Sequence, residues 1–206
     1  MTMPVRQFRP ASTPPSRRLH VSLWIASVTV VTVVAGLAGE ARARPASQVK
    51  VEDVIQILRS KSRPTPADLA VAGADVDRVL VDLLVARKVE PDVRFRAAKA
   101  LSGYPGQRAR AVLASMIPNH EEPSSLRAAM MISLALVARE KAVDDLLPWF
   151  KDADPVLRAG AGRALGETGD VRACSLLESA LEHEEVLEVR KAIEDGTKAC
   201  AKRRKP

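Results

Sequence analysis

The sequence has few of the residues on which catalysis commonly depends. After residue 43 it contains only two histidines, His120 and His183. It has no glycine-rich phosphate-binding loop, and no serine or cysteine nucleophile stands beside a plausible base. We therefore expect no catalytic residue and no cofactor, and we interpret the chain as a non-enzymatic protein.

A basic surface of the kind that binds nucleic acid is also missing once the two ends of the chain are set aside. The formal net charge is +7, but residues 1–43 hold five arginines and one glutamate, and residues 198–205 hold five more basic residues. The 154 residues between Arg44 and Thr197 contain 22 basic and 24 acidic side chains. The basic tail at residues 201–206 can touch an anionic surface, although a short solvated terminus is the commoner case. We expect no nucleic-acid partner.

Residues 1–43 are typical of an export signal. Residues 1–20 contain four arginines and no acid, residues 21–39 are uncharged, and Ala41-Arg42-Ala43 has the small-x-small pattern of a cleavage site. Cleavage after Ala43 leaves 163 residues, of which 44–48 form a linker, in the periplasm or outside the cell. The general secretory route is favoured over the twin-arginine route, because His20 stands where that signal has a bulky apolar residue. The alternative is an uncleaved anchor, since 19 uncharged residues just suffice to span a bilayer.

Strand patterns are absent after residue 48, and a helical pattern recurs instead. A Val-Arg or Leu-Arg pair places arginines at intervals of 33, 31 and 32 residues, namely Arg94, Arg127, Arg158 and Arg190. Between these pairs run apolar stripes with helical spacing, such as Val76, Val79, Leu80, Leu83 and Leu84. Such a period predicts helical hairpins that bury their apolar faces by stacking on one another, which is an all-α solenoid.

The clearest copy of the pattern, residues 154–170, contains Asp154-Pro155, Leu157-Arg158, Ala164-Leu165-Gly166 and Gly169-Asp170. These residues resemble the short HEAT-repeat variant that is named after the phycobilisome lyases. The resemblance covers about residues 75–200 and implies a right-handed α-solenoid of about four hairpins within residues 49–200. Residues 49–72 lack the arginine and predict an N-terminal capping helix pair, whose second helix opens at Pro66. Matching positions are packing positions, so the resemblance indicates fold rather than function.

Three residues predict local features of this solenoid. Pro148 falls inside the first helix of the third hairpin and is expected to bend it. Gly160 and Gly162 lower helix propensity, and we expect them to allow close approach of neighbouring helices.

The recurring arginines are predicted to be structural rather than anion-binding. Glu90 precedes Arg94 by four residues, and Asp154 precedes Arg158 by four residues. At this spacing across a helix start, the acid can cap backbone amides and pair with the arginine.

Two His-Glu-Glu sequences, at residues 120–122 and 183–185, fall in turns between the helices of a hairpin. Imidazole and carboxylates together can bind a metal ion. The two sequences are two hairpins apart, and acidic residues before a helix are ordinary N-terminal capping. We therefore favour capping over a metal site.

A candidate partner surface follows from aligning the hairpins. The positions directly after each recurring arginine, and those four residues later, are expected to lie near the concave face that the second helices form. The candidates in these two columns are Phe95, Lys99, Ile132, Arg163 and Lys191. For Phe95 and Ile132, burial between repeats is the competing interpretation.

The only two cysteines, Cys174 and Cys200, fall in the two helices of the last hairpin. An oxidising compartment favours a disulfide between them. If the turn centres near residues 184–185, however, Cys200 lies about 7.5 Å beyond Cys174 along the helix axis. Added to an interaxial distance of about 8–10 Å, this exceeds the reach of a disulfide between regular helices, unless α-helical structure is lost after Gly196. Both the disulfide and two separate thiols stay open.

Three functions are compatible with these features. The first is an exported scaffold that binds a protein partner, with membrane contact only through an uncleaved N-terminal segment. The second, which the resemblance implies, is an enzyme subunit of the chromophore-lyase type. The third is a structural or chaperone-like envelope protein.

Overall fold

The computed structural model describes residues 49–203, and this part of the chain is helical without strands. The expected signal at residues 1–43 and the linker at 44–48 lie outside it. The helices are α1 (Val51–Ser60), α2 (Pro66–Ala70), α3 (Val76–Val85), α4 (Pro91–Ala100), α5 (Gln107–Met116), α6 (Ser124–Ala138), α7 (Val143–Leu146), α8 (Pro155–Thr168), α9 (Val171–Ala180) and α10 (Leu187–Arg203). Three short 3-10 turns directly follow α4, α6 and α7: η1 (Leu101–Gly103), η2 (Arg139–Ala142) and η3 (Leu147–Lys151). Between residues 49 and 203, no helix combines the length and the apolarity needed to cross a membrane.

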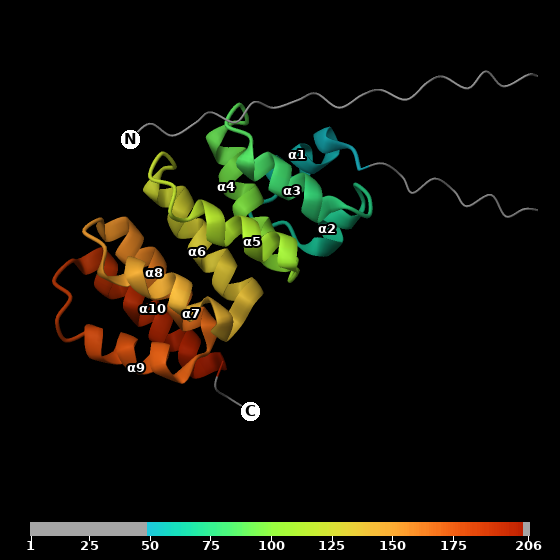
Figure 1. Ribbon diagram of the computed structural model, residues 1–206. Coiled ribbons are helices and arrows are strands. Elements are labelled where there is room, and N and C mark those ends of the chain that lie inside the picture. Colours follow the sequence, from blue (N-terminus) through green and yellow to red (C-terminus); the bar gives the residue numbers. More distant parts are fainter. Residues whose placement is uncertain (1–48, 204–206) are drawn as a thin grey trace, which may run out of the picture. The chain divides into compact units, whose positions relative to one another are not determined.

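The helices are arranged in chain order across the molecule, so that each pair packs on the pair before it (Figure 1). The second members α4, α6, α8 and α10 contact one another in succession. All five apolar residues of the Val76–Leu84 stripe are buried, as are the leucines seven positions after the first three arginines, Leu101, Leu134 and Leu165. The expected helical solenoid is therefore the observed architecture. Its core lies between the first helices and the second helices of the stacked pairs.

The N-terminal pair α1 and α2 covers the exposed end of this core. Val54 and Leu58 of α1 are buried, and α1 packs against α3 and α4. Thr65 and Asp68 form a reciprocal capping box at the start of α2, where Pro66 occupies the first turn. Only five residues of α2 are helical, so this pair is shorter than the hairpins that follow.

Pro148 divides the first helix of the third hairpin. α7 ends at Leu146, and the chain continues as the 3-10 turn η3. A proline cannot donate the i to i−4 hydrogen bond, so the tighter geometry of η3 replaces the α-helical continuation. Phe150 in η3 still reaches the core, where its side chain is buried.

Glycine residues allow the second helices to approach one another closely. A Cβ atom on Gly160 would lie 2.5 Å from the Cβ of Ala128 in α6, so the expected close approach at Gly160 is found. The tightest crossing is between α8 and α10, where a Cβ atom on Gly166 would lie 2.2 Å from the carbonyl oxygen of Gly196. Gly162 lies at the same crossing, since a Cβ atom on Gly196 would lie 2.4 Å from its carbonyl oxygen, but a Cβ on Gly162 itself would first meet a side-chain atom of Ile193 at 3.1 Å.

We predict that Gly166→Ala lowers the free energy of unfolding by about 2 kcal/mol, because backbone atoms of α10 must move to admit the methyl group. Gly162→Ala in the same helix is the matched control. It is expected to be closer to neutral, since only the Ile193 side chain, and no backbone atom, must shift, and alanine gains helix propensity of about 1 kcal/mol. Urea unfolding followed by circular dichroism measures both variants. Equal stabilities of the two variants would show that the crossing is not tightly packed.

The structure contains a disulfide between Cys174 of α9 and Cys200 of α10, with 5.9 Å between their Cα atoms. The expectation that regular helices hold the two residues too far apart is wrong, because α10 is helical through Cys200. Residues 184–186 are not helical. An extended residue advances the chain about 3.3 Å, whereas a helical residue advances it only about 1.5 Å. The loop can therefore carry the start of α10 past the end of α9, which brings Cys200 level with Cys174. In addition, Cα atoms on the facing sides of two helices each lie about 2.3 Å from their own axis in the direction of the other helix. They are therefore closer together than the two axes.

The last helix extends beyond the expected end of the solenoid at residue 200. Residues 201–203, which the sequence assigns to the basic tail, form the final turn of α10. Arg203 donates to the Glu167 carboxylate of α8 at 2.6 Å. This ion pair fixes the helix end against the preceding hairpin, and only residues 204–206 of the expected tail lie outside the described part.

Candidate binding groove and arginine ladder

Arg94 joins its own hairpin to the next one. Its Nε donates to the carbonyl oxygen of Leu84 at 2.8 Å, near the C-terminus of α3. Its Nη2 donates to the carboxylate of Glu122 at 2.7 Å, in the turn that precedes α6. Both side chains are buried, with 9% of the arginine and 4% of the glutamate exposed. One guanidinium therefore caps a helix end, where a cation is favourable, and holds the neighbouring hairpin.

Arg158 has the same role one hairpin before the C-terminus. Its Nε and Nη2 each donate to a carboxylate oxygen of Glu184 at 3.1 Å, and its Nη1 donates to the backbone oxygens of Asp152 and Ala153. The two-pronged geometry is the strong form of the arginine–carboxylate pair. The pair links α8 to the turn between α9 and α10.

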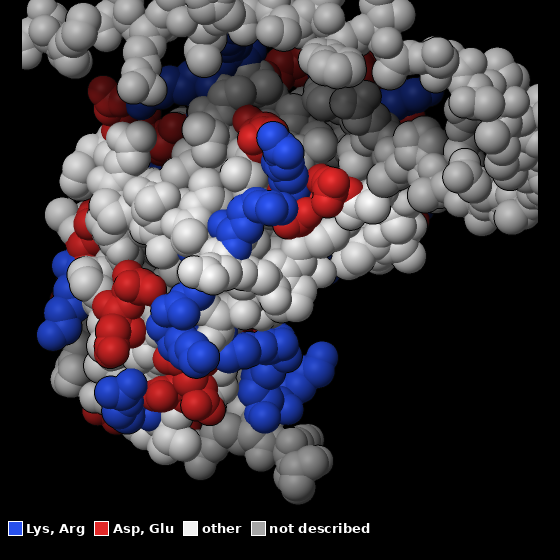
Figure 2. All heavy atoms as spheres, turned by 45° about the vertical axis from the view of Figure 1, so that its right-hand side comes forward, with Lys and Arg blue, Asp and Glu red and all other residues white. Residues whose placement is uncertain are grey.

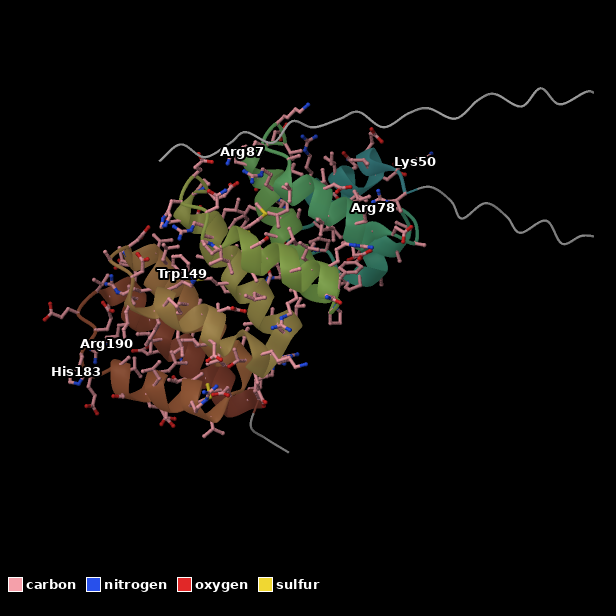
Figure 3. The ribbon with its side chains drawn as sticks, in the orientation of Figure 1. Lys50, Arg78, Arg87, Trp149, His183 and Arg190 are labelled. Carbon is pink, nitrogen blue, oxygen red and sulfur yellow. A yellow bond between two sulfur atoms is a disulfide. The ribbon has the colours of Figure 1, made fainter. Side chains whose placement is uncertain are left out.

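Arg127 lacks such a carboxylate partner. Its Nε donates to the carbonyl oxygen of Ile117 at 2.7 Å, which repeats the helix-capping contact of Arg94. Its guanidinium carbon lies 4.6 Å from the centre of the Trp149 ring, a residue labelled in Figure 3. A cation–π contact with the next hairpin thus replaces the ion pair. Within residues 49–203, its buried Nη2 has no hydrogen-bond partner.

The expected pairs within one helix start are not formed. The Glu90 carboxylate accepts no hydrogen bond from the backbone amides of α4 and instead accepts one from Arg59 of α1 at 2.7 Å. Asp154 caps α8 by accepting from the Val156 amide, as expected of a capping acid, but its other oxygen accepts from the Ser124 hydroxyl rather than from Arg158. Side chains on a helix lean toward its N-terminus, and for the buried arginines that direction leads across the hairpin to the next turn.

Arg190, the last arginine of the series, is exposed (Figure 3). No described hairpin follows it, so the carboxylate that would complete its contact is absent from residues 49–203. The four arginines therefore form a ladder of three inter-hairpin contacts and one open end. We call Arg94, Arg127 and Arg158 with their partners the arginine ladder.

The ladder carboxylates come from the two His-Glu-Glu sequences, which the sequence analysis assigned to capping. Glu122 pairs with Arg94 and Glu184 with Arg158, while Glu121 pairs with Arg87 on the surface. His120 and His183 are both exposed. Over the described residues no group of three or more potential ligands is arranged for a metal ion. The repeated position of the motif in two turns was the available signal for the ladder.

The Glu184 contact makes stability depend on pH. The hydrogen bonds from Arg158 hold the pKa of Glu184 below its ordinary value of 4.5. A carboxyl whose folded pKa is lowered stabilises the fold above its unfolded pKa, and this contribution is lost as the pH falls through the folded pKa. Glu184→Gln is therefore expected to be less stable than the native chain at pH 7, with the difference shrinking below about pH 4.5. Urea unfolding between pH 7 and pH 3 tests this, and a pH-independent difference would contradict it.

Four of the five candidate partner residues line one groove on the second helices. Phe95 and Lys99 come from α4, Ile132 from α6 and Arg163 from α8. The groove has a volume of about 740 Å³. Lys191 is exposed on α10 but does not contribute to the lining. The structure thus brings together residues from three hairpins that were singled out by alignment alone.

The floor of the groove is apolar, and its polar groups are few. Besides Phe95 and Ile132, the apolar lining consists of Ala128, Ala129, Leu136, Pro155, Val156, Ala159, Gly160 and Val186. Three serine residues, Ser102, Ser125 and Ser133, and one acid, Glu188, complete it. Phe95 and Ile132 are partly buried, pack against the core and also line the groove. Val156, which the alignment did not single out, is 45% exposed at the groove edge.

Comparison with known families identifies HEAT repeats in residues 117–196. This segment contains α6 to α9 and most of α10, and so two of the three groove-forming helices. Curated proteins offer no match to the chain. The match supports a HEAT-repeat protein, an architecture that commonly mediates protein–protein interaction.

Proposed function

We infer that this HEAT-repeat protein is an exported, non-catalytic scaffold that binds a protein partner through the groove on α4, α6 and α8. The observation that carries this proposal is the groove itself, since Phe95, Lys99, Ile132 and Arg163 line one apolar hollow. Contiguous exposed apolar surface that is rimmed by polar residues marks protein-interaction sites and binding grooves. We propose no nucleic-acid partner, because basic and acidic side chains lie next to one another on the face seen in Figure 2. A nucleic-acid-binding face would instead gather basic side chains in one patch.

Export is supported by two independent features. Residues 1–43 have the organisation of a signal, with cleavage after Ala43. The Cys174–Cys200 disulfide is of the kind that persists in oxidising compartments such as the periplasm or the extracellular space. An uncleaved anchor that keeps the solenoid outside the cytoplasm is the alternative location.

The finer fold assignment belongs to the same proposal. The pairs α3–α4, α5–α6, α7–α8 and α9–α10 support a count of four hairpins, with α1 and α2 as the N-terminal cap. We assign them to the short phycobilisome-lyase-like variant of the repeat, with a right-handed superhelix. An enzyme subunit of chromophore-lyase type is disfavoured, because no catalytic set was found in the sequence; a structural or chaperone-like envelope protein is distinguished by the experiment below.

Site-specific photo-crosslinking in cells that express the full chain tests the scaffold. A photoreactive phenylalanine analogue replaces Val156 at the groove edge, and the matched control replaces Val171, which is 59% exposed in the first turn of α9. We expect discrete crosslinked protein adducts from position 156 only, which Phe95→Ala weakens. The same adducts from both positions, or none from either, would contradict a groove-specific partner.

Intact mass measurement of the exported, unreduced protein after thiol alkylation tests the location. The expected species begins at Arg44 and carries no alkyl groups. A chain that still contains residues 1–43 would indicate an anchor, and two alkylated cysteines would refute the disulfide.

A further inference from the structure

We propose that the groove receives an amphipathic peptide segment whose apolar side chains lie on α6 and whose acidic side chain faces Lys99. This inference deepens the proposed function and rests on it, because it names the chemistry of the partner segment. It follows from the shape of the floor, from the openness of the groove and from the placement of its charges.

The floor suits a row of small to medium apolar side chains. Ala128, Ile132 and Leu136 follow one another at four-residue intervals along α6 and line the groove together. Gly160 of α8 lies against Ala128, so the two helices approach closely and neither projects a bulky side chain at that point. Phe95 on α4 forms one wall and Val156 on α8 the other. Partner side chains spaced along a helix or strand can therefore dock along α6.

The groove is open along one side, which favours an amphipathic occupant over an acyl chain. Val156 at its edge is 45% exposed although it belongs to the lining. An apolar ligand gains most when nearly all of its surface is buried. In an open groove an acyl chain leaves apolar surface in water, whereas an amphipathic segment turns its polar side outward.

The charges of the groove are placed asymmetrically. Lys99 lies at the α4 wall, where its Nζ is 5.5 Å from the centre of the Phe95 ring, and it takes part in none of the ion pairs found among residues 49–203. Arg163 already faces Asp195 of α10 at 3.6 Å. Glu188 is the acid that lines the α10 end. An acidic partner side chain is therefore attracted to the α4 end and repelled from the α10 end, which also sets the orientation of the segment.

Binding of defined peptides to the purified full chain tests this inference. The probes are two fluorescein-labelled amphipathic peptides of equal length, built from leucine and serine, which differ only at one terminal position that is glutamate in one and glutamine in the other. Fluorescence anisotropy is measured with the native chain, with Lys99→Glu and with the control Lys198→Glu, which changes an exposed lysine of α10 outside the groove lining. A fluorescent fatty acid serves as the third probe.

We expect the glutamate peptide to bind about fivefold more tightly than the glutamine peptide to the native chain and to Lys198→Glu, since one partly exposed ion pair contributes up to about 1 kcal/mol. Lys99→Glu is expected to remove or reverse this preference. Equal binding of both peptides, binding of neither, an unchanged preference in Lys99→Glu, or binding of the fatty acid alone would overturn the inference. If crosslinks at position 156 persist in that event, the scaffold stands and only the chemistry of its partner is wrong; if they are absent as well, the scaffold also fails.

Discussion

Glu122→Ala is expected to lower the free energy of unfolding by about 3–5 kcal/mol, because it leaves the buried guanidinium of Arg94 without its counter-charge. Only 9% of the Arg94 side chain and 4% of the Glu122 side chain are exposed, so water cannot replace the lost carboxylate. For a domain of this size the loss corresponds to a melting temperature lower by about 10 °C. Thermal and urea unfolding followed by circular dichroism measure the effect.

The neighbouring residue provides a matched control. Glu121 is one position earlier in the same turn and pairs with Arg87, but both side chains are largely exposed. Glu121→Ala is therefore expected to change stability little, since exposed ion pairs contribute little. Equal effects of the two substitutions would show that burial of the Arg94–Glu122 pair is not what makes it important.

A double variant separates a missing partner from a missing contact. Replacing Arg94 by methionine and Glu122 by leucine removes both charges and keeps apolar volume. We expect it to be clearly more stable than Glu122→Ala, because no buried charge is left unpaired. If the double variant is the less stable of the two, the guanidinium contact with Leu84 must dominate instead.

Reduction of the disulfide is expected to destabilise the protein by about 3 kcal/mol. Cys174 and Cys200 are 26 residues apart, and the bond limits the conformational entropy of the unfolded chain across that loop. Urea unfolding with and without a reductant measures the effect. The variant that carries alanine at both positions is the control, and its stability should not respond to reductant. A native chain that is equally stable in both conditions would contradict the prediction.

The repeat pattern predicted most of the fold because burial and helical spacing are linked. The Val76–Leu84 stripe is buried throughout, and the start of α3 coincides with its first residue. Alignment of the repeats predicted that Phe95, Lys99, Ile132 and Arg163 share one face, because they hold equivalent positions of stacked hairpins, and in the structure all four line one groove. Lys191 is the exception, because α10 reaches the groove only at its first turn.

What the sequence did not predict are contacts that cross from one hairpin to the next. The local spacing of Glu90 and Arg94 favoured a pair that the structure replaces with Arg94–Glu122, over 28 residues of sequence. Likewise, counting along the axis from a turn at residues 184–185 overestimates the separation of Cys174 and Cys200, because the non-helical loop shifts the start of α10. Both errors have the same origin, because side-chain direction and loop path depend on packing between elements.

The two ends of the solenoid are secured by different means, and this gives its opening a direction. At the C-terminal end, the disulfide, the Gly166–Gly196 crossing and the Arg203–Glu167 pair hold α10 on the preceding helices. At the other end, α1 and the five-residue α2 have no cross-link, and exposed residues 61–63 lie between them. In a stacked array, each unit is held mainly by its neighbours, so amide hydrogens should exchange first in α1 and α2. A protease that meets the folded protein would accordingly cut between these helices and leave α2 to α10 as the resistant fragment.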